Sequence, residues 1–265
     1  MNQGAFILIS VVAAVNDECI FEKNLKASNI LSNPDVKLFK QLGFSSASLA
    51  YNEGLKNSSC EIVIFAHQDV YFPTGWMDQL ASNISFLNQS DPEWAVIGVY
   101  GVKPSGEHVG QAWSSGLNKL LGKPFNQPEL VDSIDELVII LNVNSGLSFD
   151  DKLPGFHLYA TDIVQSANEV GKKAYVINAP VIHNSNSVLF LDANYYKAYS
   201  YLKHKWNKRL PIQNCILTIG GDNIIFWKRR VKDYLKSIYY LGRKKGQTLD
   251  DRLCAQQKAR ELGFE

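Results

Sequence analysis

Cysteine is scarce in this chain of 265 residues, and the cysteines it has stand far apart in the sequence. The four are Cys19, Cys60, Cys215 and Cys254. Because no two of them form a CxxC pair, the sequence predicts neither a structural zinc site nor a disulfide framework. We expect buried or unreactive thiols.

Charge imbalance and long apolar runs are also missing. The 27 basic and 26 acidic residues give a net charge of +1, which points to no nucleic-acid partner. The apolar start, residues 6–15, has no basic region before it. It is too short to span a bilayer and makes a poor signal peptide. We interpret it as the first strand of a soluble, cytoplasmic protein.

No glycine-rich turn follows that first strand, where residues 13–17 read Ala-Ala-Val-Asn-Asp. This weakens the case for a Rossmann-type dinucleotide or methyl-donor enzyme, in which such a turn approaches the phosphates.

What the chain does have is an alternation of strand-like and helix-like segments, which predicts an α/β protein with a mostly parallel central sheet flanked by helices. The expected strands cover residues 6–15, 36–43, 61–66, 94–102, 137–141 and 173–182. The expected helices cover residues 17–31, 46–57, 73–87 and 160–170. Residues 103–128 are rich in Gly, Pro, Asn and Ser without a sustained period, which predicts a long functional loop.

The segment EIVIFAHQDVYFP, residues 61–73, is the most informative. A buried-type strand stops abruptly at His67-Gln68-Asp69, and open α/β sheets bind ligands at the carboxyl ends of their strands. An imidazole and a carboxylate at that position could form a binding site for a divalent metal or a phosphate. The alternative is that Asp69 only starts a turn before Pro73.

Beyond about residue 190 the composition changes. Residues 197–245 hold thirteen Lys or Arg against two acids, Asp222 and Asp233, with aromatic residues between them. This pattern is typical of basic amphipathic helices. We therefore expect two regions, a domain over residues 1–190 and a basic, aromatic helical region over residues 191–265 packed on it. The basic surface is either a solvated outer face or a contact with an anionic membrane or another polyanion.

The order of these pieces resembles the GT-A fold of family-2-like glycosyltransferases, in particular a bacterial group whose metal motif reads HQD. The resemblance covers about residues 6–185, with a KW…LP element at 205–211. It is carried by the segments VVAAVND, SLAYNEGL, FAHQDVYFP, VDSIDELVIILN, FDDKLPGFHLYATDIVQSANEVGKKAYVI and VIHNS.

The resemblance implies a nucleotide-diphospho-sugar transferase that uses a divalent metal and is expected to invert the anomeric centre. Asp69 would be the metal-facing carboxylate, with His67 and His183 as further ligands for Mn²⁺ or Mg²⁺. It also implies donor contacts from Asn16, Asp17, Asn52, Gln68 and Asp132. Asn16 and Asp17 are equally suited to capping a helix. We expect one of the two residues to bind the donor and the other to cap a helix. For Asp132 the alternative is an exposed loop carboxylate.

The implied donor is a nucleotide sugar, most simply a UDP-sugar. The implied acceptor is a saccharide or lipid-linked sugar of a growing bacterial surface polysaccharide, or else a glycoprotein. The protein would act in the cytoplasm, with a peripheral contact at the inner face of the membrane.

The catalytic base is where the chain departs from the pattern. The family's segment reads roughly FHxYDxD, and Ala160 stands at the place of its first Asp. Asp162 remains, two residues further along the helix, and His157 is a second candidate that titrates near neutral pH. The alternative function is a catalytically impaired homologue that binds nucleotide sugar or acts as a scaffold.

Overall fold

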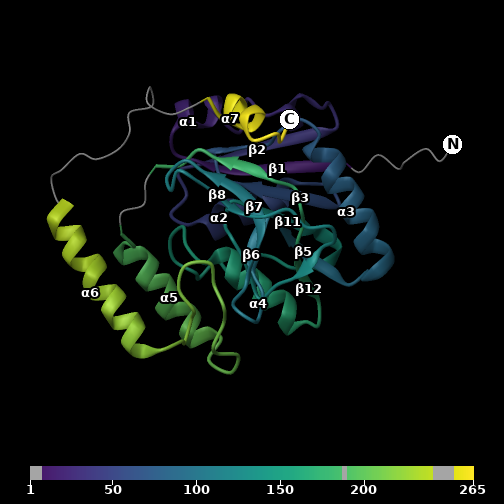
Figure 1. The fold of residues 1–265 in the computed structure, drawn as a ribbon. Coiled ribbons are helices and arrows are strands. Elements are labelled where there is room, and N and C mark those ends of the chain that lie inside the picture. Colours follow the sequence, from purple (N-terminus) through teal and green to yellow (C-terminus); the bar gives the residue numbers. More distant parts are fainter. Residues whose placement is uncertain (1–7, 187–189, 241–253) are drawn as a thin grey trace.

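The computed structural model describes residues 8–186, 190–240 and 254–265. Its central element is a seven-stranded sheet (Figure 1). From edge to edge it consists of β2 (Val36–Leu42), β1 (Ile9–Val15), β3 (Ile62–Ala66), β11 (Val138–Asn142), β5 (Trp94–Gly98), β12 (Lys173–Val176) and β9 (Glu129–Leu130). β1 is parallel to β2 and β3, β12 is parallel to β5, and β11 is antiparallel to both β3 and β5. The strands β2, β1, β3, β5 and β12 therefore point the same way, as a mostly parallel sheet requires.

Helices cover both faces of this sheet because its central strands are apolar on both sides. All residues of β3 and β5 are buried. In β3, Val63 and Phe65 join one apolar cluster, whereas Ile62 and Ile64 join the other. The helices of the first cluster are α2 (Ala47–Asn57), α4 (Tyr159–Glu169) and α5 (Ala193–Lys205). Those of the second are α1 (Glu18–Lys23) and α3 (Trp76–Ser90).

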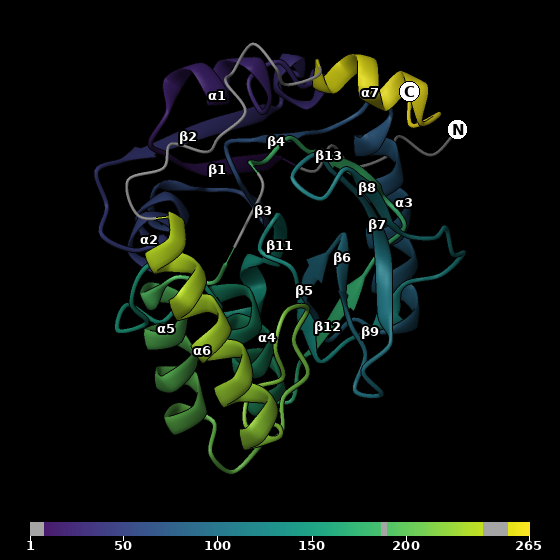
Figure 2. The same cartoon turned by 60° about the vertical axis from the view of Figure 1, so that its left-hand side comes forward.

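A second sheet lies across the carboxyl ends of the first in the order β10, β6, β7, β13, β4, with β8 paired to β7 (Figure 2). Its strands are β10 (Ser133–Ile134), β6 (Tyr100–Val102), β7 (His108–Ser114), β13 (Val181–His183), β4 (Val70–Tyr71) and β8 (Lys119–Gly122). The expectation of a long loop over residues 103–128 is therefore wrong. β7 and β8 form a hairpin there, and the glycines that read as loop residues let its strands approach closely.

Three expected elements are shorter than predicted. The stretch 94–102 divides into β5 and β6, and 173–182 divides into β12 and β13, because the chain passes from one sheet to the other between them. The helix expected over 17–31 ends at Lys23, and a 3-10 helix, η1 (Asn29–Ser32), follows after turns. Residues 6 and 7 of the expected first strand lie outside the described residues.

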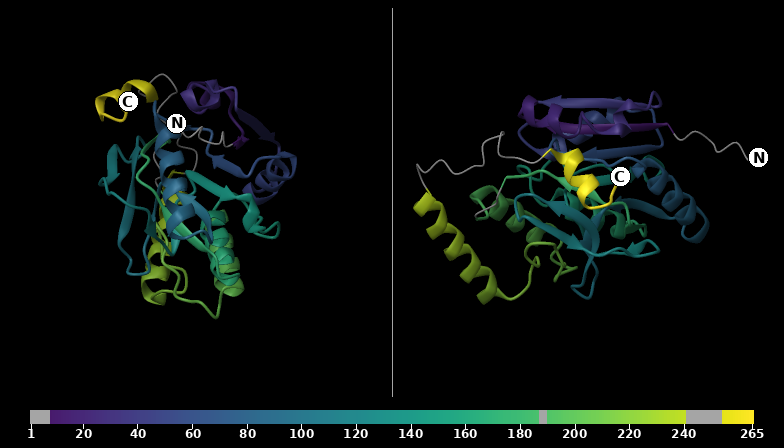
Figure 3. Two further views of the ribbon diagram at one scale, coloured as in Figure 1. Left: turned by 90° about the vertical axis from the view of Figure 1, so that its right-hand side faces the viewer. Right: turned by 45° about the horizontal axis from the view of Figure 1, so that its top comes forward.

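The basic C-terminal region is helical, as predicted, and consists of α5, α6 (Asn223–Tyr240) and α7 (Ala255–Glu261). α5 packs into the same apolar cluster as α4, and α6 lies outside α5 at the edge of the molecule (Figures 1 and 3). The expected basic residues 243–245 lie outside the described residues. Among the described helices, none combines the length and hydropathy needed to cross a membrane. The domain boundary near residue 190 stays a prediction.

Candidate metal centre and adjoining pocket

Three potential metal ligands meet where β3 and β13 end. His67 and Asp69 follow β3, and His183 is the last residue of β13. β13 pairs with β4 so that His183 lies opposite Val70, next to Asp69. One ligand atom from each of the three residues lies within 4.8 Å of the others, and Nε2 of His183 is 3.4 Å from Oδ1 of Asp69. The structure thus brings together the three residues expected from the sequence as metal ligands, and their role as ligands stays a prediction.

The charge states of the cluster suit a divalent cation. Burial by itself raises the pKa of Asp69, but the His183 and His67 imidazoles outweigh it and hold this pKa below its usual range. Burial lowers the pKa of His67, against the opposing charge of Asp69. At neutral pH the cluster therefore offers a carboxylate and a neutral imidazole, the forms in which these groups bind metals. Two imidazoles and one carboxylate fit Mn²⁺, and Mg²⁺ would rely more on water and substrate oxygens.

Tyr159, the first residue of α4, orients one of these ligands. Its hydroxyl oxygen is 2.7 Å from Nε2 of His67, and the same hydroxyl lies 3.4 Å from the backbone oxygen of Glu136. An oxygen at one ring nitrogen fixes the imidazole and leaves the other nitrogen for a metal. The sequence reasoning did not single out Tyr159, although it stands in the FHLYATD segment.

A cavity of about 650 Å³ adjoins the cluster at the carboxyl ends of β1, β2 and β3. It is lined by Ala14, Val15, Asn16, Gln41, Gly43, Phe44, Tyr51, His67, Gln68, Asp69, Phe156 and Tyr159. Among the described residues that line it, Asp69 is the one carboxylate. Gln41, Phe44, Tyr51 and Phe156 were not expected here, although Tyr51 and Phe156 adjoin the expected residues Asn52 and His157.

Asn16, Asp17 and Gln68 are joined by hydrogen bonds, and Asn16 and Gln68 line this cavity. Oε1 of Gln68 accepts hydrogen bonds from the backbone N–H groups of Asn16 (3.0 Å) and Asp17 (3.1 Å), and Nε2 of Gln68 donates to Oδ1 of Asn16 (2.6 Å). Asp17 instead caps α1 by accepting from the N–H of Ile20 at 3.0 Å. One residue of the pair thus faces the cavity and the other caps a helix.

Asn52 and Asp132 lie outside the cavity lining and hold loops in place. Nδ2 of Asn52 donates to the backbone oxygen of Phe149 (2.8 Å), and its Oδ1 accepts from the N–H of the same residue (2.9 Å). Asp132 accepts from the backbone N–H of Gln213 (2.8 Å) and from Nε2 of Gln165 (3.2 Å). Any effect of either side chain on a ligand in the cavity passes through these contacts.

The two candidate bases also have partners away from the cavity. Asp162 is buried, and its carboxylate accepts from Nζ of Lys205 (2.9 Å) and Nε1 of Trp206 (2.8 Å). Burial raises the pKa of Asp162, and Lys205 opposes that rise. Nε2 of His157 is 3.5 Å from Oδ1 of Asp192, and burial lowers the pKa of His157 against that carboxylate. Ala160 is fully buried in the apolar cluster around α4.

Asp135 and Glu136 form an acidic pair just before β11. The charge of Asp135 raises the pKa of His67, opposing burial. Glu136 accepts a hydrogen bond from the backbone N–H of Leu158, and burial raises the pKa of Glu136 to about 8. The sequence signal for both is the acidic pair directly before a buried strand.

Comparison with known proteins identifies the family. A curated protein of Fuscovulum blasticum described as "ATP synthase subunits region ORF 6" is 27% identical over 169 residues, which is 60% of this chain and 67% of that protein. Among solved structures, GalNAc-T7 with UDP, GalNAc and Mn²⁺ matches 89% of this chain and 57% of its own chain (15% identity, TM-score 0.49). The Pyrobaculum calidifontis mannosyltransferase PcManGT, in complex with GDP-Man and Mn²⁺, matches 91% of this chain and 66% of its own (12% identity, TM-score 0.43). This chain thus spans less than two thirds of either solved chain.

The profile of one family, described as "Glycosyltransferase like family", matches residues 10–205. This range runs from β1 to the end of α5 and includes all three residues of the metal cluster. The sheets flanked by helices agree with the α/β, GT-A fold class expected from the sequence. The chain therefore belongs to the glycosyltransferase-like family.

Proposed function

We propose that this protein is a metal-assisted glycosyltransferase that moves a sugar from a nucleoside-diphosphate donor to an acceptor hydroxyl, with inversion. A UDP-sugar is the first donor to test. The proposal rests on one observation, the cluster of His67, Asp69 and His183 beside a cavity at the ends of strands, which His67 and Asp69 line. Its volume of about 650 Å³ falls within the usual range for small-molecule sites, about 300–1,000 Å³.

We assign each site residue a role according to its position. Asp69, His67 and His183 would hold the metal, which neutralises charge on the departing diphosphate. Asn16 and Gln68 line the cavity and are proposed to contact the nucleotide. Asp17, Asn52 and Asp132 are proposed to act on the donor site indirectly, by fixing α1 and the loops that they bind.

An inverting transfer needs a group that takes the proton of the acceptor hydroxyl. We keep Asp162 and His157 as proposed bases and add Asp135, whose charge reaches His67. The carboxylate of Asp162 accepts hydrogen bonds from Lys205 and Trp206. To act as the base it must give up these hydrogen bonds and accept one from the acceptor hydroxyl instead.

The acceptor is proposed to be a saccharide or lipid-linked sugar of a growing bacterial surface polysaccharide, or else a glycoprotein. A cytoplasmic location with a peripheral contact at the inner face of the membrane is part of the same proposal.

One observation favours the second candidate function, a homologue that binds nucleotide sugar without transferring it. The carboxylate of Asp162 is fully engaged by cationic and indole donors, and Ala160 offers no replacement. Such a protein would retain metal and donor binding without turnover.

Binding and turnover can be tested separately. Calorimetric titration of UDP with and without Mn²⁺ should show metal-dependent binding that Asp69→Asn weakens by at least about 10- to 100-fold, because loss of a ligand should cost no less than loss of a partner outside the ligand shell. Asp78→Asn, on the exposed side of α3, is the control for loss of a carboxylate. Equal affinity in wild type and Asp69→Asn would refute the metal assignment.

Transfer and donor hydrolysis over a panel of nucleotide sugars then separate the two functions. If Asp162, His157 or Asp135 is the base, its replacement in Asp162→Asn, His157→Ala or Asp135→Asn should lower the transfer rate by about 10²-fold or more. UDP affinity should stay unchanged in that variant. Wild type that binds UDP and Mn²⁺ but transfers and hydrolyses no donor would favour the binding homologue.

A further inference from the structure

Helix α6 carries an apolar stripe that faces away from the protein. Five residues recur at intervals of three and four along the helix and so share one face. They are Ile224, Trp227, Val231, Leu235 and Ile238. Each is between 52% and 64% exposed. An outward stripe of this length inverts the usual arrangement of a surface helix, whose apolar side faces the core.

The opposite face of α6 holds the helix against α5. The Phe226 ring stacks on Tyr199 with 4.6 Å between centroids. The buried carboxylate of Asp233 accepts from the Tyr196 hydroxyl at 2.8 Å and from Nε of Arg229 at 2.8 Å. These contacts fix which side of α6 points outward, and Figure 2 shows α6 as the layer outside α5.

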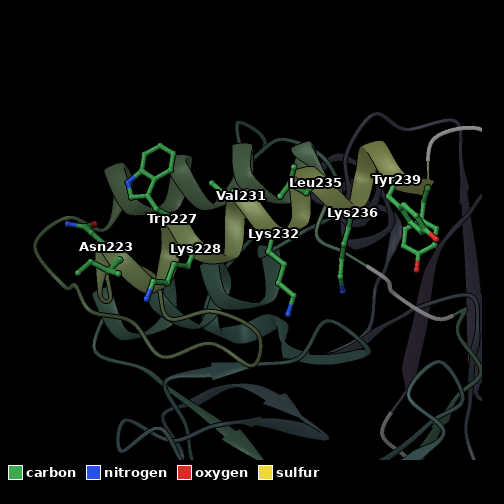
Figure 4. Close-up of a pocket in the computed structure, with 10 residues that line it drawn as sticks. Asn223, Trp227, Lys228, Val231, Lys232, Leu235, Lys236 and Tyr239 are labelled. Carbon is green, nitrogen blue, oxygen red and sulfur yellow. The ribbon is translucent and has the colours of Figure 1, made fainter.

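Cations border the stripe. Lys228, Lys232 and Lys236 follow one another at i, i+4 and form a row beside it, and Figure 4 shows this row along one side of α6, with Trp227, Val231 and Leu235 along the other. Arg230 borders the stripe on its other side and lies over the rings of Trp227 and Tyr196. The acidic residue of α6, Asp233, is on the inward face. The outward face therefore combines apolar side chains with positive charge alone.

We infer that α6 docks this protein on an anionic lipid bilayer, lying in the plane of the membrane surface with the stripe in the lipid. Helices that bind membranes this way have Lys or Arg beside a Trp- and Leu-containing face, and each cation near an anionic surface adds attraction. At 1.5 Å per residue, the stripe from Ile224 to Ile238 extends about 21 Å along the helix. A second copy of α6 on the same stripe would set cations against cations, which charge complementarity disfavours.

This inference names the surface for the peripheral membrane contact in the proposed function, and its test needs no transferase activity. The full chain is sedimented with vesicles of phosphatidylcholine containing about one third phosphatidylglycerol, and with phosphatidylcholine alone. Wild type should sediment with the anionic vesicles at low ionic strength and at least about 10-fold less at high ionic strength, because salt screens the attraction.

Two paired variants address the two halves of the surface. Val231→Glu with Leu235→Glu charges the stripe, and Lys228→Glu with Lys232→Glu reverses the row. Each should lower the partition coefficient by about 10-fold or more. Leu117→Glu, at a leucine that is 61% exposed on the β7–β8 turn, controls for charge on an exposed leucine. Lys23→Glu with Lys56→Glu, on exposed positions of α1 and α2, controls for net charge. UDP binding with Mn²⁺ should be unchanged in all variants, which shows that they fold.

Trp227 gives a second readout. Of the five tryptophans, Trp76, Trp94 and Trp206 are buried and Trp113 is partly buried, whereas Trp227 is 55% exposed. Lipids brominated on the acyl chain should quench wild-type fluorescence, and Trp227→Phe should abolish most of that quenching. Binding that the paired α6 variants leave unchanged would overturn the inference. Equal binding of wild type to neutral and to anionic vesicles would also overturn it. So would the absence of vesicle binding together with a wild-type dimer that Leu235→Glu dissociates.

Discussion

Glu136 is a half-buried residue whose carboxyl group has a backbone amide as its partner. It accepts a hydrogen bond from the N–H of Leu158, the residue before α4, which has a positive φ of 65°. Burial raises the pKa of Glu136 to about 8, and the charge of Asp135 adds to that rise. In the folded protein this group is therefore protonated at neutral pH, whereas in the unfolded chain it ionises near pH 4.5.

This difference predicts a pH-dependent stability. Between about pH 5 and pH 8 the folded state holds a proton that the unfolded state has lost, so this group's contribution to the free energy of unfolding falls as pH rises, by up to about 1.4 kcal/mol per pH unit. Glu136→Gln keeps an oxygen acceptor for Leu158 and removes the titration. Urea unfolding at several pH values should show a flatter pH dependence for Glu136→Gln than for wild type, whereas Glu22→Gln on the surface of α1 should leave the dependence unchanged. The same slope in Glu136→Gln and wild type would contradict a protonated Glu136 in the folded protein.

The residue scale also shows what sequence could and could not predict. His67 and Asp69 were predictable because a buried strand ends directly before them. Asp162 and Asn52 have residue types suited to a site, but the structure gives them buried or loop-holding partners. Only the fold decides whether such a side chain faces a cavity or a neighbouring element. Tyr159 reaches His67 for the same reason, because α4 packs over the main sheet within the apolar cluster that β3 also joins.

At the scale of elements, the hairpin of β7 and β8 depends on two glycines that touch. A Cβ atom built on Gly122 would lie 1.8 Å from the backbone oxygen of Gly110, and Gly122 has φ of +69°. Gly110 has φ of +109°, and a Cβ there would lie 2.2 Å from the backbone oxygen of Val99. β7 connects β6 to β13, which ends in the metal ligand His183.

Gly122→Ala is therefore expected to destabilise the protein by about 2–4 kcal/mol, because it adds a backbone clash to the cost of a positive φ. Gly146→Ala separates the two effects, since Gly146 has φ of +74° with nothing within 4 Å of its would-be Cβ. It should cost only about 1 kcal/mol. Chemical denaturation of both variants measures the difference, and equal losses would mean that the hairpin opens to accommodate the methyl group.

These elements show why the strands of the main sheet were predictable and the hairpin was not. β3 and β5 are apolar runs of five residues, and this short length favours a buried strand over a helix. β7 and β8 contain glycines at positions where a Cβ atom would clash with a neighbouring strand, and this requirement is visible only in the folded structure. Likewise, nothing in residues 94–102 marks Val99 as the point where the chain leaves one sheet for the other.

At the scale of the whole molecule, the last described helix returns to the strands that hold the metal cluster. Ala255 and Ala259 of α7 form an apolar cluster with Tyr71 of β4 and Ile182 of β13. The Tyr71 hydroxyl donates to Glu265 at 2.6 Å. Tyr71 and Ile182 pair across β4 and β13, one residue from Val70 and His183. The end of the chain thus braces the two strands that set His183 beside Asp69.

Undocking α7 should therefore weaken metal binding without altering any ligand. Ala259 is fully buried, and Ala259→Asp would place a carboxylate in that apolar contact, which favours release of the helix over burial of the charge. We expect a lower melting temperature and a Mn²⁺ affinity, measured with UDP present, that falls by about 10-fold, the lower end of what changes outside the ligand shell cost metal sites. Gln257→Asp adds the same side chain on the exposed side of α7 and should change neither value. If Ala259→Asp lowers the melting temperature but leaves Mn²⁺ affinity intact, β4 and β13 hold the ligands without help from α7.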